Sequence, residues 1–417
     1  MNRILRIPLV PLLLAVVAPS SAALQEADPE ATPNGLWEAL GAGRTWLNLR
    51  HRFEAASIDG LPKDADASTL RTALGYETGR YKGFRALLEF ESISLVGDDN
   101  FNSTTNGAVE YPVVADPVGT EVNQVYLGYD GFDGVDVRLG RQEISLGNQR
   151  FVGAVPWRQN HQSFDALRVM ADVSSSTKLD YSAVWNVNRI FGDQSTQGDE
   201  MLNAHFLNVV ADLGEVGQGT AYGYLVDFDD NRTLSSNTFG ARFEGEADLG
   251  EVKVGYVVEA AQQTDAYGNP IDLDADYRFL ELAGTFAGTT LKLGSETLGG
   301  SGAPGDRFST PFATLHKFNG FADVFLNTPD AGLEDNYVAL SRSFDVEALP
   351  GPIKLLARYH VFSSDAGDSD YGTELDLNAA VPLSERIGLG LRYADFDADG
   401  GFADTTRCMA WLTVRVL

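Results

Sequence analysis

The chain has 417 residues, a formal net charge of −28 and a hydrophobic content of 44%. The excess of acidic residues argues against nucleic acid as a partner, because binding to phosphates needs Lys and Arg. The single cysteine, Cys408, excludes an intramolecular disulfide, so the fold must be held by a large core or by closed backbone pairing.

The N-terminus has the pattern of a secretory signal. Two arginines precede an apolar run over residues 7–18, which is too short to span a bilayer as a helix, and small residues up to Ala23 suit cleavage. We therefore assign residues 1–23 to a signal peptide and expect the mature chain to leave the cytoplasm. Residues 24–44 are acidic and contain prolines, which indicates a periplasmic N-terminal segment.

From residue 45 onward, apolar and polar residues alternate in short segments, a pattern typical of β-strands with two different faces. Turns rich in Gly, Asp, Asn and Pro separate these segments, and short turns alternate with longer acidic loops such as residues 97–119. A tight turn at Asp130-Gly131 is expected to join strands over residues 122–129 and 135–139. Counting the segments gives about 18 strands.

This pattern predicts an all-β fold in which residues 45–417 form a transmembrane antiparallel β-barrel with long extracellular loops. No later stretch approaches about 18 consecutive apolar residues, so a transmembrane helix is not expected. Closure of the sheet pairs every backbone N–H and C=O, as the hydrocarbon of a membrane demands. A barrel of roughly 16 to 18 strands is wide enough for an aqueous lumen. The expected location is the outer membrane, which the chain crosses many times.

Charged residues share one face of these strands. A charged side chain on the lipid-facing side at the bilayer midplane would cost about 2–4 kcal/mol, so the charged face is expected to line a wet lumen. Arg71 and Arg85 lie on this face together with Glu77, Glu89 and Glu91. The alternative is that the charges pair across neighbouring strands and only stiffen the wall.

The stretch of residues 140–169 is charged, aromatic and rich in glycine. Arginines recur through it, although most other charges of the chain are acidic. An arginine-rich constriction favours anions, as charged rings select ions in other pores. The residues expected to line the lumen or its constriction are Arg71, Arg85, Arg138, Arg141, Gln142, Arg150, Arg158, Asp165 and Arg168.

The same stretch carries a family resemblance. The runs GRQE, WR and FDAxR within residues 140–168, and a second block over residues 316–335 that begins HKFNGFAD, resemble the signature of the alginate export family of outer-membrane porins. The resemblance implies an 18-stranded barrel that lets a polyanion leave through an arginine-lined passage. It also implies that the lumenal wall or constriction contains Arg141, Arg150, Arg158 and Arg168.

We therefore expect an outer-membrane channel that passes anionic or polar solutes, with oligosaccharides and anionic polysaccharides such as alginate among the candidate cargoes. The expected partners are outer-membrane lipid and lipopolysaccharide, the barrel assembly machinery, and a solute such as an oligo- or polyuronate. The barrel is expected to be a monomer. No cofactor, metal site or catalytic residue is expected.

Two other function classes stay open. The run His161-Gln162-Ser163 suggests an outer-membrane phospholipase, but Phe164-Asp165 stand where that family has Asn-Gly. A nucleophile without its positioned base and oxyanion donors does little. A structural or adhesin barrel is the third class, and it would have a blocked lumen and no conductance.

Overall fold

A computed structural model describes residue 33 and residues 35–417. The predicted signal peptide lies outside the described residues, as do residues 24–32 and 34 of the predicted periplasmic segment. The described end of that segment forms a short helix, α1 (Leu36–Gly41), just before the first strand. Within the described residues, no helix is long enough and apolar enough to cross a membrane.

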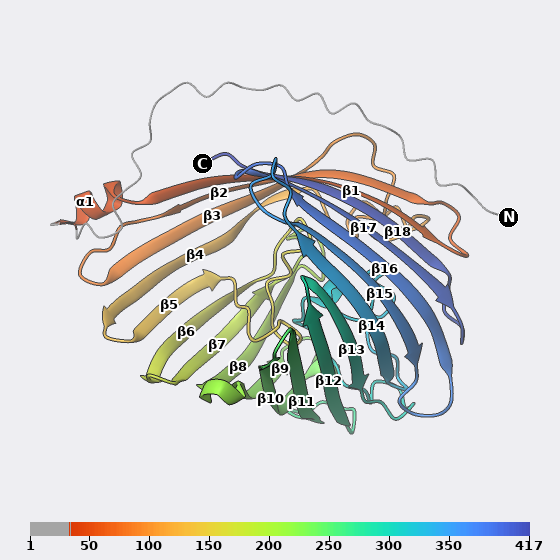
Figure 1. Cartoon of the computed structure of the whole chain (residues 1–417). Helices are drawn as coiled ribbons and strands as arrows, with labels where there is room; N and C mark the ends of the chain where they lie inside the picture. Colours follow the sequence, from red (N-terminus) through yellow and green to blue (C-terminus); the bar gives the residue numbers. More distant parts are fainter. Residues whose placement is uncertain (1–32, 34) are drawn as a thin grey trace.

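Eighteen antiparallel strands form a single sheet in which neighbours in sequence are neighbours in space. β1 pairs with both β2 and β18, so the sheet closes into a barrel, and Figure 1 shows the strands wrapping around coil segments inside it. The predicted fold class and strand number are confirmed. The strands are β1 (Arg44–Ile58), β2 (Ala65–Glu77), β3 (Phe84–Leu95), β4 (Gly119–Phe132), β5 (Val135–Gln142), β6 (Ser163–Ser174), β7 (Thr177–Asn188), β8 (Asp199–Asp212), β9 (Gln218–Phe228), β10 (Ser236–Leu249), β11 (Val252–Asp265), β12 (Asp274–Phe286), β13 (Thr289–Leu298), β14 (Leu333–Phe344), β15 (Ile353–Ser363), β16 (Asp370–Pro382), β17 (Ile387–Ala398) and β18 (Thr405–Arg415).

The turn between β4 and β5 differs from the prediction. Asp130 and Gly131 belong to the end of β4, and the turn lies at Asp133-Gly134, where Gly134 adopts a φ of +68°. Both positions carry an Asp-Gly pair, so this sequence signal does not choose between them. The ladder shifts register beyond Tyr129, and this bulge carries the strand past the predicted turn.

Large apolar side chains point outward along the strands. Leu74, Leu139, Leu282, Leu340 and Leu391 are each about half exposed. Their neighbours in sequence point to the inner face, as the alternation of side chains along a strand requires. An outer surface of this kind stabilises the barrel only when hydrocarbon covers it.

The connections at the two ends of the barrel differ in length. Tight turns, such as the one at residues 287–288, join strands at the end that also holds α1 and the C-terminus. Two of the longer connections at the other end fold back inside: the first inward loop is residues 143–162, between β5 and β6, and the second inward loop is residues 299–332, between β13 and β14. Outer-membrane barrels have short periplasmic turns, so the end with the tight turns is periplasmic.

The inward loops form a hydrophobic core inside the barrel. Phe151 of the first loop and Phe308 and Phe312 of the second contact the inward aromatic residues Phe206 and Tyr277. All five side chains are buried. The lumen is therefore only partly polar, whereas the sequence led us to expect a wet interior lined by charged residues. The reason is that inward positions toward the extracellular end carry Phe and Tyr instead of charged residues.

The seam that closes the barrel joins its first and last strands. Its register places Asn48 opposite Arg415. On the inner side of the seam, Nη1 of Arg407 on β18 donates to Oε1 of Glu54 on β1 at 2.6 Å. Backbone pairing and a buried ion pair thus hold the two ends of the sheet together.

Candidate functional site

The two inward loops meet inside the barrel and hold each other by backbone hydrogen bonds. The N–H of Gly153 donates to the carbonyl of Phe312 at 2.9 Å, and the N–H of Thr314 donates to the carbonyl of Gln149 at 3.0 Å. Gln149 and Val155 adopt φ values of +69° and +51°, in the left-handed region that such residues rarely take. Such conformations persist only where surrounding contacts fix them. The two loops therefore have a defined structure that constricts the barrel.

Arg150 joins both inward loops to the barrel wall. Its side chain is 1% exposed, and its Nε lies 2.7 Å from Oε1 of Glu296 on β13. Its Nη2 donates to Oδ1 of Asn319 in the second inward loop at 2.9 Å, and its guanidinium lies 4.8 Å from the ring centroid of Phe318. A buried charge is tolerated only when it is paired and hydrogen-bonded, and Arg150 meets both conditions.

Arg158 is the second buried arginine of the first inward loop. Its Nη2 lies 2.8 Å from Oδ2 of Asp323 in the second inward loop, and its Nη1 lies 3.5 Å from Oε2 of Glu54. Glu54 also accepts hydrogen bonds from Arg52 and Arg407. The complete cluster holds three charges of each sign, and its members are Arg52, Arg158, Arg407, Glu54, Asp116 and Asp323.

The arginines predicted on the inner wall are paired with carboxylates as well. Arg168 lies with Nε 2.9 Å from Oδ1 of Asp180. Gln142 is fully buried and donates to the carbonyl of Ala166 at 3.2 Å. The remaining arginines pair with nearby acids: Arg138 with Asp136, Arg71 with Glu91, and Arg85 with Glu77, Asp130 and Asp136.

Arg141 and Asp165 pair with each other, but not in the lumen. Their Nε and Oδ1 atoms are 2.8 Å apart. Alternation along β5 places Arg141 on the side of Leu139, which is 53% exposed, and opposite to the buried Gln142. The pair therefore lies on the outer side of the wall near its extracellular end, which corrects the lumenal place predicted for both residues.

Each arginine predicted from the sequence thus has a carboxylate partner. Arg150 and Arg158 hold the constriction together, and the others stiffen the wall. These contacts fit the alternative in which paired charges are structural. Contact of these arginines with a passing solute stays a prediction.

Three other arginines face inward without an ion pair, and we call Arg50, Arg358 and Arg392 the unpaired arginines. In the described part of the chain, no carboxylate oxygen lies within ion-pair distance of any of them. Arg50 donates to neutral partners, Oε1 of Gln159 at 2.8 Å and the carbonyl of Pro156 at 2.7 Å. Each lies at or before the midpoint of its strand, counted from the periplasmic end. These three arginines were not among the predicted site residues, because alternation marks the inward face of a strand but not the ion pairing of its side chains.

Aromatic rings hold two of the unpaired arginines. The guanidinium of Arg392 lies 3.8 Å from the ring centroid of Phe321 and 4.4 Å from that of Trp157. That of Arg358 lies 5.3 Å from the ring centroid of Tyr337 and 5.6 Å from that of Phe321. A guanidinium on an aromatic face keeps its N–H edge available for an anion.

The nearest acids are occupied by the second inward loop. Asp376 stands opposite Arg358 in the β15–β16 ladder, but its Oδ1 accepts from the N–H of Phe321 at 3.1 Å. Oε1 of Glu374 accepts from the N–H of Ala322 at 2.8 Å. One oxygen of each carboxylate thus fastens the loop to the wall, whereas Oδ2 of Asp376 and Oε2 of Glu374 accept no hydrogen bond within the described residues.

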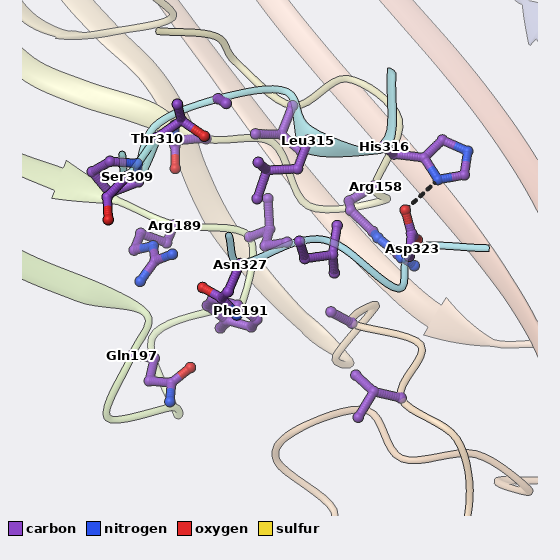
Figure 2. Close-up of a pocket in the computed structure, with 18 of the residues that line it drawn as sticks. Arg158, Arg189, Phe191, Gln197, Ser309, Thr310, Leu315, His316, Asp323 and Asn327 are labelled. Carbon is purple, nitrogen blue, oxygen red and sulfur yellow. Dashed lines mark hydrogen bonds and ion pairs between the residues drawn. The ribbon is translucent and has the colours of Figure 1, made fainter. Parts of the chain in front are cut away.

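A chamber of about 690 Å³ lies on the extracellular side of the constriction, within the size range of small-molecule sites. Figure 2 shows its lining, which includes Leu315 and Phe191 together with the paired residues Arg158 and Asp323. None of the unpaired arginines lines it. The chamber and the unpaired arginines therefore lie on opposite sides of the inward loops.

His316 belongs to the second inward loop and lines the chamber. Its Nδ1 lies 2.7 Å from Oδ1 of Asp323, as the dashed line in Figure 2 marks, and its ring stacks on Trp157 with centroids 4.2 Å apart. Burial lowers the pKa of His316 to about 4, although the carboxylate of Asp323 opposes this shift. The imidazole is therefore neutral at pH 7.

The model of the alginate export family matches residues 64–291, more than half of the chain. This match covers the first signature block and ends before the second. A comparison with curated proteins finds no match.

Solved structures of outer-membrane proteins share the barrel. OccK9 (OpdG) of Pseudomonas aeruginosa is 14% identical with a TM-score of 0.69, and the match covers 91% of this chain and 100% of that one. OccAB4 of Acinetobacter baumannii is 14% identical with a TM-score of 0.67, over 89% and 97% of the two chains. OpdK of Pseudomonas aeruginosa, solved with vanillate, is 13% identical with a TM-score of 0.66, over 90% and 99%. At these identities the likeness supports the fold alone.

Proposed function

The chain belongs to the alginate export family and is an integral outer-membrane channel, not an enzyme, and we propose that its unpaired arginines select small anionic solutes. One observation carries the proposed selectivity. Arg50, Arg358 and Arg392 face the lumen without a carboxylate partner among the described residues, in a chain whose formal net charge is −28.

Unpaired and paired arginines differ in the field that a solute meets. The charge of a paired arginine is largely cancelled by its carboxylate at a few ångströms, whereas an unpaired charge attracts an anion by about 1 kcal/mol at 4 Å in water and by more in a less polar setting. The unpaired arginines are only half-buried, so they remain in contact with solvent. Guanidinium edges also bind carboxylates at two points.

The constriction favours a small solute. The inward loops fill part of the barrel interior, and the extracellular chamber of about 690 Å³ suits a molecule of limited size. The structural neighbour OpdK was solved with vanillate, and we propose that this chain passes solutes of a similar size. Short oligouronates derived from alginate meet the same requirement of charge.

The test is the reversal potential of the refolded protein in planar bilayers under a salt gradient. We expect anion selectivity in the wild type. The double variant R50Q/R392Q should lower the ratio of anion to cation permeability by about fivefold for each lost charge, because about 1 kcal/mol corresponds to that factor. Vanillate or an oligouronate added to either side should block the wild type more strongly than the variant.

The matched control is R168Q/D180N, which removes an arginine together with its carboxylate partner. Its selectivity should equal that of the wild type. A cation-selective wild type, or equal selectivity in R50Q/R392Q and the wild type, would reject the proposal while leaving the channel itself intact.

A barrel without conductance is the second candidate function. It is favoured by the hydrophobic core that the inward loops form inside the barrel. The same recordings separate the two candidates. A wild type that conducts no ions, with conductance appearing once the second inward loop is shortened, would support a closed barrel.

A further inference from the structure

We propose that Glu91, Glu143 and His161 form a binding site for a divalent transition-metal ion of the Zn²⁺ type. One ligand atom from each residue lies within 4.8 Å of the other two. Glu91 belongs to β3, whereas Glu143 begins the first inward loop and His161 lies near its end. The site joins both ends of that loop to the wall, and it does not depend on the solute selectivity proposed above.

The spacing of the ligand atoms suits a single ion. Nδ1 of His161 lies 2.8 Å from Oε1 of Glu143 and 3.5 Å from Oε1 of Glu91. Atoms that bind one Zn²⁺ ion at about 2.0–2.2 Å are separated by about 3 Å. An ion can therefore replace the proton between His161 and Glu143 with little movement of the three side chains.

A buried amide beside the cluster carries an unused acceptor. Asn123 is 4% exposed, and its Oδ1 has no hydrogen-bond partner among the described residues. The amide lies beside the cluster, because its Nδ2 donates to Oε1 of Glu143 at 2.8 Å and to Oε1 of Glu89 at 2.7 Å. Nε2 of His161 is likewise buried without a partner in the described part. Buried polar atoms are seldom left unsatisfied, and rotation of the Asn123 amide, which gives up its hydrogen bond to Glu89, would supply the ion with a neutral oxygen.

The surrounding charges are compatible with a dication. Arg71 donates to Oε1 of Glu91, and the N–H of His161 donates to Oε2 of the same carboxylate at 3.0 Å. With a neutral imidazole, the two carboxylates and Arg71 sum to one negative charge. The contacts from Arg71 and from the backbone hold Glu91 in place, as the groups that support metal ligands do.

The ligand types determine the class of metal. Imidazole combined with carboxylates is typical of Zn²⁺, Ni²⁺ and Cu²⁺, whereas Ca²⁺ and Mg²⁺ prefer oxygen ligands alone. An ion at this position would tie the two ends of the first inward loop to β3. It would therefore restrain the constriction.

The test is calorimetric titration of ZnCl₂ into the untagged full chain, refolded in detergent and freed of metal by a chelator. We expect saturable binding of one ion per chain. H161Q and E143Q should each weaken it by at least about tenfold, since even groups that only support metal ligands contribute that much. The matched control is H205Q, because His205 lies on β8 and its Nδ1 contacts Tyr181.

Two further measurements guard against misfolding and non-specific adsorption. Circular dichroism of each variant must match that of the wild type. Zinc K-edge absorption of the loaded wild type, which needs no variant, should show one imidazole and a shell of oxygens at about 2.0–2.2 Å. The proposal fails if the wild type adsorbs Zn²⁺ without saturation, if H161Q binds as the wild type does, or if the spectrum shows no imidazole.

Discussion

Arg150 and Arg392 both point into the barrel, and their surroundings differ in the partner available to each. Arg150 is buried against Glu296 and Asn319. Arg392 is half-buried between the rings of Phe321 and Trp157 and donates to the amide oxygen of Asn378 at 3.2 Å. The first is therefore held by the fold, and the second keeps its charge toward the lumen. The comparison teaches that an arginine in a channel has to be judged by its partners and not by its orientation.

The largest expected effect comes from removing the paired arginine. Arg150→Ala leaves Glu296 buried without its cation, and breaking a buried pair costs about 3–5 kcal/mol. We expect this loss in the free energy of unfolding, measured by urea titration with tryptophan fluorescence in lipid vesicles. A change of less than about 1 kcal/mol would show that Arg150 does not hold the loops.

The next largest effect is the pH dependence of the free energy of unfolding that His316 causes at the junction of the two inward loops. The pKa of buried His316 is about 4 in the folded chain, below its ordinary value of 6.5. The unfolded chain therefore binds the proton first, so stability is complete above pH 6.5 and is lost as pH falls toward 4. The loss amounts to as much as about 3 kcal/mol.

This pH dependence is measured as the difference in free energy of unfolding between the wild type and H316Q at pH 7 and at pH 4.5. H316Q should lack the component that His316 contributes. Although burial opposes the shift, His316 and the nearby arginines hold the pKa of Asp323 below its ordinary range. Protonation of Asp323 therefore lowers the free energy of unfolding only at a pH below the range in which His316 titrates. Equal slopes for the two proteins would contradict the prediction.

A smaller change in stability is expected for the unpaired arginine. Arg392→Gln leaves no carboxylate without a partner, so it should cost only about 1 kcal/mol, the value of the lost contacts with Trp157 and Phe321. Its conductance should nevertheless shift toward cations. Urea titration and the reversal potential of the same preparation report the two effects, and a stability loss as large as that of Arg150→Ala would erase the distinction between the two arginines.

The smallest effect is expected at the surface. Arg278 pairs with Asp365 at 3.3 Å, but its side chain is 62% exposed. Arg278→Ala should therefore change the free energy of unfolding by at most about 1 kcal/mol, and less at high salt. This variant also serves as the control for Arg150→Ala, and a salt-independent loss of several kcal/mol would contradict it.

The fold could be predicted because alternation depends only on neighbouring residues. Arg71 and Arg85 were placed on the inner face by the alternation of apolar and polar residues alone, and the strand count followed from the turns. The same alternation would have placed Arg141 outward with Leu139, so that error was avoidable. The error in the position of the turn after Tyr129 could not be avoided, since two Asp-Gly pairs are equally good turn signals there.

The constriction could not be predicted, because its contacts join distant parts of the chain. Arg150 and Glu296 are 146 residues apart in sequence, and Arg158 and Asp323 are 165 apart. Both signature blocks were recognised, yet nothing local shows that they fold inward and bind each other. The unpaired arginines could not be predicted either, because alternation does not show whether a carboxylate of the described residues lies within ion-pair distance of an inward arginine.

The seam between β1 and β18 has a consequence for the order of assembly. Every other pairing of strands joins chain neighbours, but Glu54 and Arg407 are separated by 353 residues. Bringing such distant positions together costs about 5 kcal/mol in loop-closure entropy. Local hairpins are therefore expected to form first and the seam last. Until then the sheet has two open edges, which hydrocarbon does not tolerate, so the nascent protein needs a temporary partner along both edges.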